Sequence, residues 1–300
     1  MSLVVVGSVA LDSVETPTET RENVLGGSAV FFTYAASFFT GVKLVSVVGE
    51  DWPAKYTELL NSRGIDTSGL DVVSGGKTFF WRGRYLDDMN QRETLDVQLN
   101  VFGEFDPKLP EAHRRCKYLF LANGPPAIQA RVLDQCPGTQ LSVADTMDLW
   151  IKSTRPELDA LLRRVDGLLL NDGEAKLLAG EENLVKAGHA IRRMGPRFVI
   201  IKKGEHGAMF FGEHETYVMP AYPTEDLVDP TGAGDSFGGG MMGYLAEQND
   251  FSPAALKKAM AYGTLAASFA VEGFSLDGLQ RVERADIDRR MEQYRRMLSF

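Results

Sequence analysis

The sequence contains few cysteines and histidines, and this scarcity excludes several kinds of protein. Only Cys116 and Cys136 occur among the 300 residues, and the four histidines do not cluster with them. Two cysteines are too few for a disulfide framework, and their spacing does not match a structural zinc site. We therefore expect a cytoplasmic protein that depends on its hydrophobic core for stability.

Basic runs and long apolar runs are also missing. The chain has 32 Lys and Arg against 41 Asp and Glu, a formal net charge of −9, so nucleic acid and anionic membranes are poor partners. No apolar stretch reaches the length of a membrane-spanning helix, and the first residues, MSLVVVGSVALD, lack the basic segment of a signal peptide. With 44% hydrophobic residues, the chain can bury the core of a large α/β domain.

Short β-branched runs alternate with segments of helical periodicity. This alternation predicts a mostly parallel sheet covered by helices on both faces, in one domain over residues 1–300. The predicted strands cover residues 3–12, 43–51, 117–124, 139–146, 167–174 and 197–204. Several of these runs end in polar residues, and ligands bind beyond the carboxyl ends of parallel strands. We therefore expect the functional site at that edge of the sheet.

One segment interrupts the alternation. Residues 74–105 contain two strand-like runs, KTFFWRGRYL and ETLDVQLNVF, which are joined by the turn-forming DDMNQR with no helix between them. Together with the polar stretch after Asp12, they predict a small β lid formed by about 13–25 and 74–104.

The first lid run has apolar residues at both parities. Phe79, Trp81 and Tyr85 would lie on one face, and Phe80 and Leu86 on the other. One face can cover the substrate, whereas the other needs a partner, because a small sheet cannot bury both faces itself. We therefore predict a homodimer through the lid, with Phe80 in the contact.

The segment DPTGAGDSFGGG, residues 229–240, places an acid in very flexible backbone. The residues after Asp235 favour a helix, and the amides at a helix N-terminus attract an anion. A carboxylate there would repel the anion unless it has another role. On the GD dipeptide alone, a plain helix-capping aspartate would be the simpler interpretation.

Phosphoryl transfer accounts for the whole segment. The amides of Gly232, Ala233 and Gly234 would stabilise charge on the transferred phosphate, while Asp235 would accept the proton of the attacking hydroxyl. We expect an ordinary carboxylate pKa to be sufficient for this proton transfer.

The segment DPTGAGDSFGGG also resembles the second signature of the ribokinase-like (PfkB) carbohydrate and nucleoside kinases. VVVGSVALD, LGGSA, NDGE and KKGEHGA are similar to further family elements, in the family's order, so the resemblance covers essentially the whole chain. It implies a three-layer α/β/α sandwich with a mostly parallel central sheet and a small β lid. The implied reaction is ATP- and Mg²⁺-dependent transfer of the γ-phosphate to a hydroxymethyl group of a small sugar or sugar-like substrate. A nucleoside kinase and a non-catalytic sugar or nucleotide sensor are the alternatives.

The resemblance implies roles for individual residues. The implied substrate-binding residues are Asp12, Gly26, Gly27 and Asp145. The implied nucleotide-binding residues are Asn171, Glu174, Lys202, Gly204, Gly207 and Tyr262, of which Asn171 and Glu174 would organise Mg²⁺ through water. Asp229 and Thr231, with carbonyls near Ala270 and Gly273, match the position of a monovalent cation such as K⁺.

Some of these positions have a second interpretation or depart from the family. NDGE also matches a helix capping box. Lys202 stands where the family usually has a hydroxyl residue, so it could pair with phosphate or with an acid. Phe31 stands where many sugar-specific members have asparagine, and the lid is unusually aromatic; both features favour the nucleoside alternative, although aromatic residues in hairpins more often simply pack.

Overall fold

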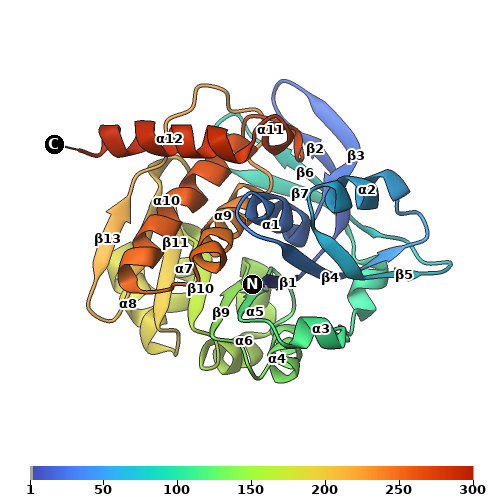
Figure 1. Cartoon of the computed structure of the whole chain (residues 1–300), viewed down its shortest axis with the longest axis horizontal. Helices are drawn as coiled ribbons and strands as arrows, with labels where there is room; N and C mark the ends of the chain where they lie inside the picture. The colour runs from blue at the N-terminus through green and yellow to red at the C-terminus, as the bar shows by residue number, and fades with distance from the viewer. Residues whose placement is uncertain (1–2, 300) are drawn as a thin grey trace.

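The computed structural model describes residues 3–299 and contains two sheets (Figure 1). The larger sheet has nine strands in this described part, in the order β13 (Thr216–Met219), β12 (Ala208–Phe211), β11 (Phe198–Lys202), β10 (Gly167–Asn171), β9 (Leu141–Asp145), β8 (Tyr118–Leu121), β1 (Leu3–Val6), β4 (Val42–Gly49) and β5 (Asp66–Val73). Only the pairs β11–β12 and β12–β13 are antiparallel. The predicted, mostly parallel sheet is therefore confirmed.

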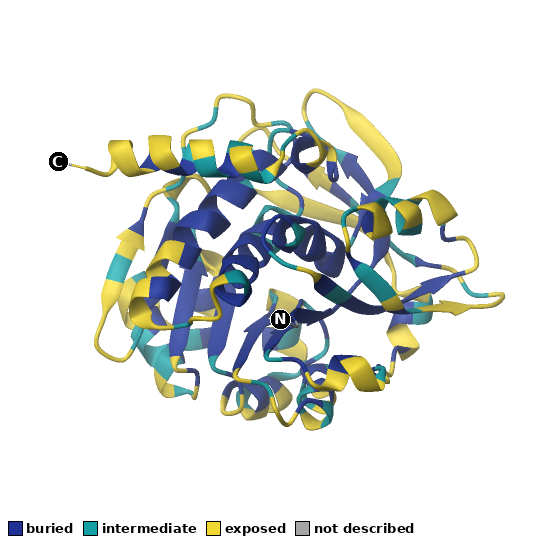
Figure 2. Ribbon diagram, viewed as in Figure 1, coloured by how far each residue is buried: buried dark blue, intermediate teal, exposed yellow. Residues whose placement is uncertain are grey.

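The central strands are buried on both faces, as Figure 2 shows. In β1 the side chain of Val5 packs into one apolar cluster and that of Val4 into another, on opposite sides of the sheet. A strand without polar alternation is stable only between two covering layers, because each face needs apolar cover.

Helices supply these two layers. The first layer comprises α1 (Ser28–Ser37), α2 (Ala54–Ser62), α9 (Ala233–Gln248), α10 (Pro253–Ala270), α11 (Asp277–Gln280) and α12 (Arg284–Met297). The second comprises α4 (Pro126–Gln135), α5 (Asp148–Ser153), α6 (Arg155–Leu162), α7 (Asp172–Ala179) and α8 (Leu184–Arg193), with the short α3 (Glu111–Arg114) beside β5. This is the predicted three-layer α/β/α sandwich. Within residues 3–299 no helix is both long and apolar enough to cross a membrane.

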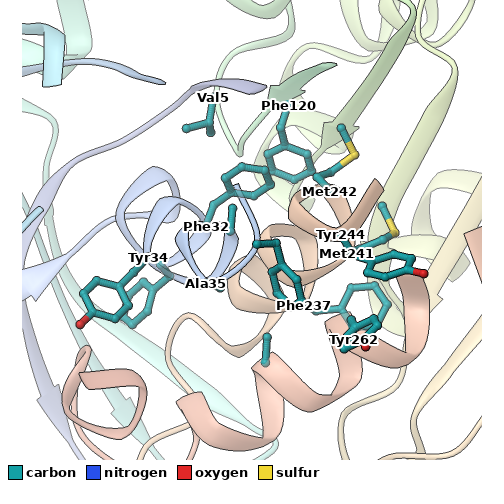
Figure 3. Packing of buried hydrophobic residues seen from close by; sticks show 14 of the residues in the cluster. Val5, Phe32, Tyr34, Ala35, Phe120, Phe237, Met241, Met242, Tyr244 and Tyr262 are labelled. Carbon is teal, nitrogen blue, oxygen red and sulfur yellow. The ribbon is translucent and has the colours of Figure 1, made fainter. Parts of the chain in front are cut away.

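Helix α9 packs closely between α1 and α10 because glycines line its contact with each of them, Gly239 and Gly243 against α1 and Gly240 against α10. A Cβ on Gly239 would overlap the Phe32 carbonyl oxygen, and a Cβ on Gly243 would lie 2.9 Å from Ala36 Cα. Beside this contact the Phe32 ring stacks on Phe120 of β8, with ring centroids 4.2 Å apart (Figure 3). The glycines that follow Asp235 in the sequence therefore allow close helix packing, which fixes the start of α9 over the sheet.

The predicted single strand over residues 3–12 is wrong in one respect. The chain leaves the large sheet after Val6, and residues from Ala10 onward form β2 (Ala10–Glu15) of the second sheet. Between them, the Ser8 hydroxyl accepts the amide of Ser28, and the Ser8 carbonyl accepts the amide of Ala29. The crossing segment thus makes hydrogen bonds with the first turn of α1 through Ser8, and with Val45 and Ser46 of β4 through Gly7.

The second sheet has four strands among the described residues, in the order β3 (Thr20–Gly26), β2, β6 (Phe79–Tyr85) and β7 (Arg92–Gln98). It lies at upper right in Figure 1. Its strands fall within or overlap the segments predicted to form the lid. Two 3₁₀ turns, Asn100–Glu104 and Gly204–His206, complete the regular structure.

Candidate active site

An ion pair lies at the carboxyl ends of the central strands. Lys202 ends β11 and Asp145 ends β9, and the lysine Nζ lies 2.9 Å from Asp145 Oδ2. The two side chains are only 17% and 6% exposed. Burial alone would lower the pKa of Lys202, but Asp145, followed by Glu174 and Asp235, raises it above its usual value. The lysine therefore stays charged among three carboxyl groups.

Asp235 lies in the first turn of α9, where the backbone is open to a ligand. Gly232, the N-cap residue, has φ +75°, and a Cβ there would overlap the Phe31 ring, so both geometry and space require glycine. Within residues 3–299 the amides of Gly232, Gly234 and Asp235 donate no hydrogen bond to a backbone carbonyl. The Ala233 amide differs from the prediction, because it already donates to the Pro230 carbonyl at 3.2 Å.

The pKa of Asp235 is not the ordinary value expected from the sequence. Burial and then the charge of Asp145 raise this pKa to about 8, although Lys202 and Arg92 act in the opposite direction. A carboxylate that resists ionisation in this way is a strong proton acceptor once it is ionised.

Asp12 lies on β2 at the other side of the site, against the two glycines at the end of β3. A Cβ on Gly26 would overlap Asp12 Oδ2, and the Gly27 amide, at φ +96°, lies near enough to lower the pKa of the same carboxyl group. The Asp12 side chain is buried, and burial raises its pKa to about 7. The di-glycine element therefore leaves room for a carboxylate to lie directly on the main chain.

Asn171 and Glu174 form the capping box that NDGE predicts at the start of α7. The Asn171 side chain accepts the Glu174 amide at 2.8 Å, and Glu174 Oε2 accepts the Asn171 amide at 2.7 Å. Burial, and next the charge of Asp145, raise the pKa of Glu174 to about 7. The capping box thus holds Glu174 beside the Lys202–Asp145 pair.

Asp229 has a buried oxygen without a partner. Its Oδ1 accepts the Thr231 amide at 2.9 Å. The Ser275 amide is near enough to oppose the rise in the pKa of Asp229, but Oδ2 makes no hydrogen bond of ordinary geometry among residues 3–299. The side chain is fully buried, and burial raises the pKa of Asp229 to about 6. An orphaned carboxylate oxygen of this kind fits a cation ligand.

The remaining predicted nucleotide residues lie in two places. Gly204 and Gly207 have φ of +53° and +81° and bracket the turn between β11 and β12. Tyr262 lies in α10, where its ring stacks on Tyr244 and its hydroxyl donates to Asp288. Its contact with a nucleotide stays a prediction.

Two residues of the second sheet reach the site and were not assigned to it from the sequence. The Tyr85 hydroxyl accepts a hydrogen bond from Thr231 at 3.2 Å, in the loop before α9. Arg92 faces Tyr85 across the β6–β7 pair, near enough for its charge to affect the pKa of Asp235. The sequence contains one indication of this: Tyr85 and Arg92 lie close to the two ends of the predicted hairpin turn, where residues of the two strands lie opposite each other.

The comparisons with known proteins agree with this arrangement. A family model described as pfkB family carbohydrate kinase matches residues 119–278. A cytidine kinase of Thermococcus kodakarensis is 30% identical over 249 residues, covering 81% of this chain and 87% of that protein. A nucleoside kinase of Methanothermobacter thermautotrophicus is 28% identical over 266 residues, covering 87% and 82%. The chain belongs to the pfkB family of carbohydrate kinases.

Solved structures share the fold of this kinase over nearly its whole length. The nucleoside kinase of Methanocaldococcus jannaschii has a TM-score of 0.78 at 19% identity, covering 97% of this chain and 98% of that one. A putative ribokinase II of E. coli, in complex with ATP and Mg²⁺, has a TM-score of 0.77 at 20% identity, covering 97% and 99%. With the family established, the kinase is a phosphotransferase that acts on a hydroxyl group.

We predict that Gly26→Ala damages substrate binding more than folding. The added methyl group would displace the Asp12 carboxylate, so the KM for the acceptor should rise at least about tenfold, since a site loses affinity when its polar groups are misplaced. Steady-state kinetics with the acceptor varied would measure this. Gly41→Ala is the matched control, because a Cβ at Gly41 meets no atom within 4 Å. An unchanged KM in Gly26→Ala would show that the acceptor does not bind at Asp12.

Proposed function

We propose that this kinase transfers the γ-phosphate of ATP to the hydroxymethyl group on the ribose of a nucleoside. The observation that carries the proposal is a buried carboxylate, Asp12, near a half-buried one, Asp235, at the open N-terminus of α9. Asp12 suits the binding of sugar hydroxyls, because a buried acceptor favours donors that satisfy it. Asp235 suits proton removal from the hydroxyl that attacks.

The chemical step needs few protein groups. The acceptor oxygen forms a bond to the γ-phosphorus, the bond from that phosphorus to the β-phosphate oxygen breaks, and ADP leaves. The hydroxyl proton passes to the Asp235 carboxylate. The amides of Gly232 and Gly234, at the N-terminus of α9, would stabilise the negative charge of the transferred group.

Mg²⁺ would be held beside Asn171 and Glu174 and would neutralise charge on the phosphates. Among the described residues no group of three or more His, Cys, Asp or Glu side chains gathers at one point to hold a metal ion. Mg²⁺ commonly takes most of its ligands from water and substrate phosphates, so one raised-pKa carboxylate at the site fits such an arrangement.

The names of the relatives support a nucleoside as acceptor. Both long matches are to nucleoside-phosphorylating enzymes, a cytidine kinase and a nucleoside kinase. Trp81 lies on the same face of the second sheet as Asp12, with which it is paired, and so offers a ring near the sugar site. Phe31 adds no support, because it packs beneath Gly232. A small free sugar, the first expectation from the sequence, is the second candidate and is favoured by Asp12 itself.

A screen of ADP release with ATP and Mg²⁺ tests the function. We expect activity with one or more ribonucleosides above that with pentoses, hexoses and sugar acids. Asp235→Asn should lower kcat at least about 10²-fold while leaving the KM for ATP near that of the wild type, because it removes the proton acceptor alone. A purified wild type that binds ATP but releases no ADP with any acceptor would support the non-catalytic sensor instead.

The stability that Asp235→Asn gains relative to the wild type should grow as the pH rises. The pKa of Asp235 is raised from its ordinary value of 3.8 to about 8 in the folded protein. Between these values the folded state keeps a proton that the unfolded state has released, so Asp235 lowers the free energy of unfolding progressively with increasing pH. Asp235→Asn should therefore raise Tm more at pH 8.5 than at pH 5, as measured by thermal unfolding. An equal change in Tm at both pH values would contradict a raised pKa for Asp235.

We also propose that K⁺ or a similar ion binds at Asp229 and supports the loop before α9. The orphaned Oδ2 of Asp229 and the neighbouring main-chain carbonyls are ligands suited to such an ion. Replacing Na⁺ or Tris by K⁺ at constant ionic strength should raise activity several-fold. A flat response across cations would remove the cation site and leave the kinase proposal intact.

We further propose that the second sheet is a lid and the dimer contact. Its edge strand β7 is exposed along its whole length, and the apolar side chains of Leu95, Val97 and Leu99 at this edge are 41%, 47% and 45% exposed. Open apolar edges are usually covered in stable proteins. Phe80 lies on the face of the sheet opposite to Asp12 and Trp81 and pairs with Gln98 of the edge strand.

Phe80→Glu should therefore convert a dimer into a monomer with a folded main domain. Sedimentation at micromolar concentration would measure the mass, and circular dichroism would check folding. Leu149→Glu, at an exposed position on α5, is the control and should remain dimeric. A monomeric wild type, or a dimer that the Phe80 variant leaves intact, would refute the contact.

A further inference from the structure

The hairpin formed by β6 and β7 carries three arginines, two of which form salt bridges within the sheet while the third does not. Arg82 and Arg84 lie on one face, where both guanidinium groups bind the Glu15 carboxylate, at 2.5 Å and 2.8 Å. Arg92 lies on the other face and makes no salt bridge with any residue in the described part of the chain. One arginine of this hairpin therefore remains available to an anion.

The geometry of the sheet places Arg92 on the face of the active site. Arg92 pairs with Tyr85, whose hydroxyl bonds to Thr231, and its guanidinium carbon lies 5.6 Å from the centroid of the Trp81 ring. Trp81 in turn pairs with Asp12 across β2 and β6, and paired residues share a face. The guanidinium is therefore on the same side as Asp12 and the loop before α9.

Packing below the arginine defines its position. The Trp81 ring lies against Gly83, where a Cβ would overlap the ring. Arg92 lies over this ring, an arrangement that guanidinium groups favour. The Tyr85 hydroxyl is within reach of the same guanidinium. Arg92 is thus oriented although it is exposed to solvent.

The turn of the hairpin lies against the turn predicted to bind the nucleotide. A Cβ on Gly204 would lie 3.0 Å from Asn90 Oδ1, so the two turns touch. Asp88 Oδ1 accepts the amides of Asn90 and Gln91, which makes the turn between β6 and β7 well ordered. The hairpin therefore spans from the acceptor side, at Asp12, to the nucleotide side, at Gly204.

We propose that Arg92 is a catalytic residue that contacts the transferred phosphoryl group and stabilises its charge in the transition state. This inference rests on the proposed kinase function and adds a residue to it. The group moves from the nucleotide side to the acceptor side, and Arg92 is the cation without a salt bridge on the hairpin that spans both. A planar guanidinium can bind two oxygens of such a group at once, which Lys202, already paired with Asp145, is less able to do.

The electrostatics of the site are consistent with this role. Burial raises the pKa of Asp12, Glu174 and Asp235, and the positive charge of Arg92 opposes that rise in all three carboxyl groups. The guanidinium is therefore near enough to all three carboxyl groups for its charge to act on each of them.

Kinetics of Arg92→Ala and Arg92→Lys would test the proposal, with Arg84→Ala as the control from the opposite face. Removing a charged donor from a transition state costs at least about 10² in rate, so kcat should fall by that factor in Arg92→Ala, with the acceptor KM within about threefold of wild type. Arg92→Lys should lose less activity, and added guanidinium ion should partly restore Arg92→Ala. A raised acceptor KM with unchanged kcat, or unchanged kinetics, would overturn the assignment.

A binding measurement separates this inference from the kinase activity. ADP with fluoroaluminate imitates the transferring group, and calorimetry would compare its affinity with that of ADP alone. Arg92→Ala should lose about tenfold or more of the affinity for the ADP–fluoroaluminate pair while binding ADP as the wild type does, since the contact is made to the transferring group only. If the wild type has no kinase activity but binds ADP–fluoroaluminate more tightly than Arg92→Ala does, the proposed function is refuted and the contact between Arg92 and the anion is supported. Equal affinities in the wild type and Arg92→Ala would refute the contact even if the kinase is active.

Discussion

Buried negative charge at the carboxyl edge of the large sheet is the constraint on which the rest of the structure depends. Asp12, Asp145, Glu174, Asp229 and Asp235 lie at or beside this edge. Lys202 pairs with Asp145, and the charge of the exposed Arg92 acts on Asp12, Glu174 and Asp235. Ionising a carboxyl group away from water costs free energy, and this raises the pKa of Asp12, Glu174, Asp229 and Asp235. These four acids therefore hold protons at pH values where exposed acids would not. Cations that enter with a nucleotide would displace those protons and make the carboxylates available for chemistry.

The fold holds this unfavourable arrangement by means of rigid packing around it. The glycines of α9 let the helix lie directly on α1 and α10, and the Phe31 ring supports Gly232 from below. The capping box of α7 fixes Glu174 at its place beside Lys202. Each contact is ordinary packing or hydrogen bonding, and together they offset the cost of a site whose charges do not balance.

The second sheet separates its charges between two faces. Its outer face pairs Glu15 with Arg82 and Arg84, so this charge is neutralised within the sheet. Its inner face carries Asp12 on β2 and Arg92 on β7, with Trp81 between their strands. Because successive residues of a strand point to opposite faces, one hairpin can be a solvated surface on one side and part of a reaction site on the other.

Much of this protein could be predicted from the local sequence. Apolar runs without alternation predicted the central strands, and the single segment DPTGAGD predicted the loop and helix that carry Asp235, because both patterns reflect short-range chemistry. NDGE predicted the capping box for the same reason.

The tertiary structure decided which groups from distant parts of the chain come into contact. The pairing of Lys202 with Asp145 joins residues 57 positions apart, and the raised pKa of Asp235 depends on burial that no local segment encodes. The split of residues 3–12 between two sheets and the place of Arg92 over the site likewise follow from strand pairing, which is a contact between remote parts of the chain.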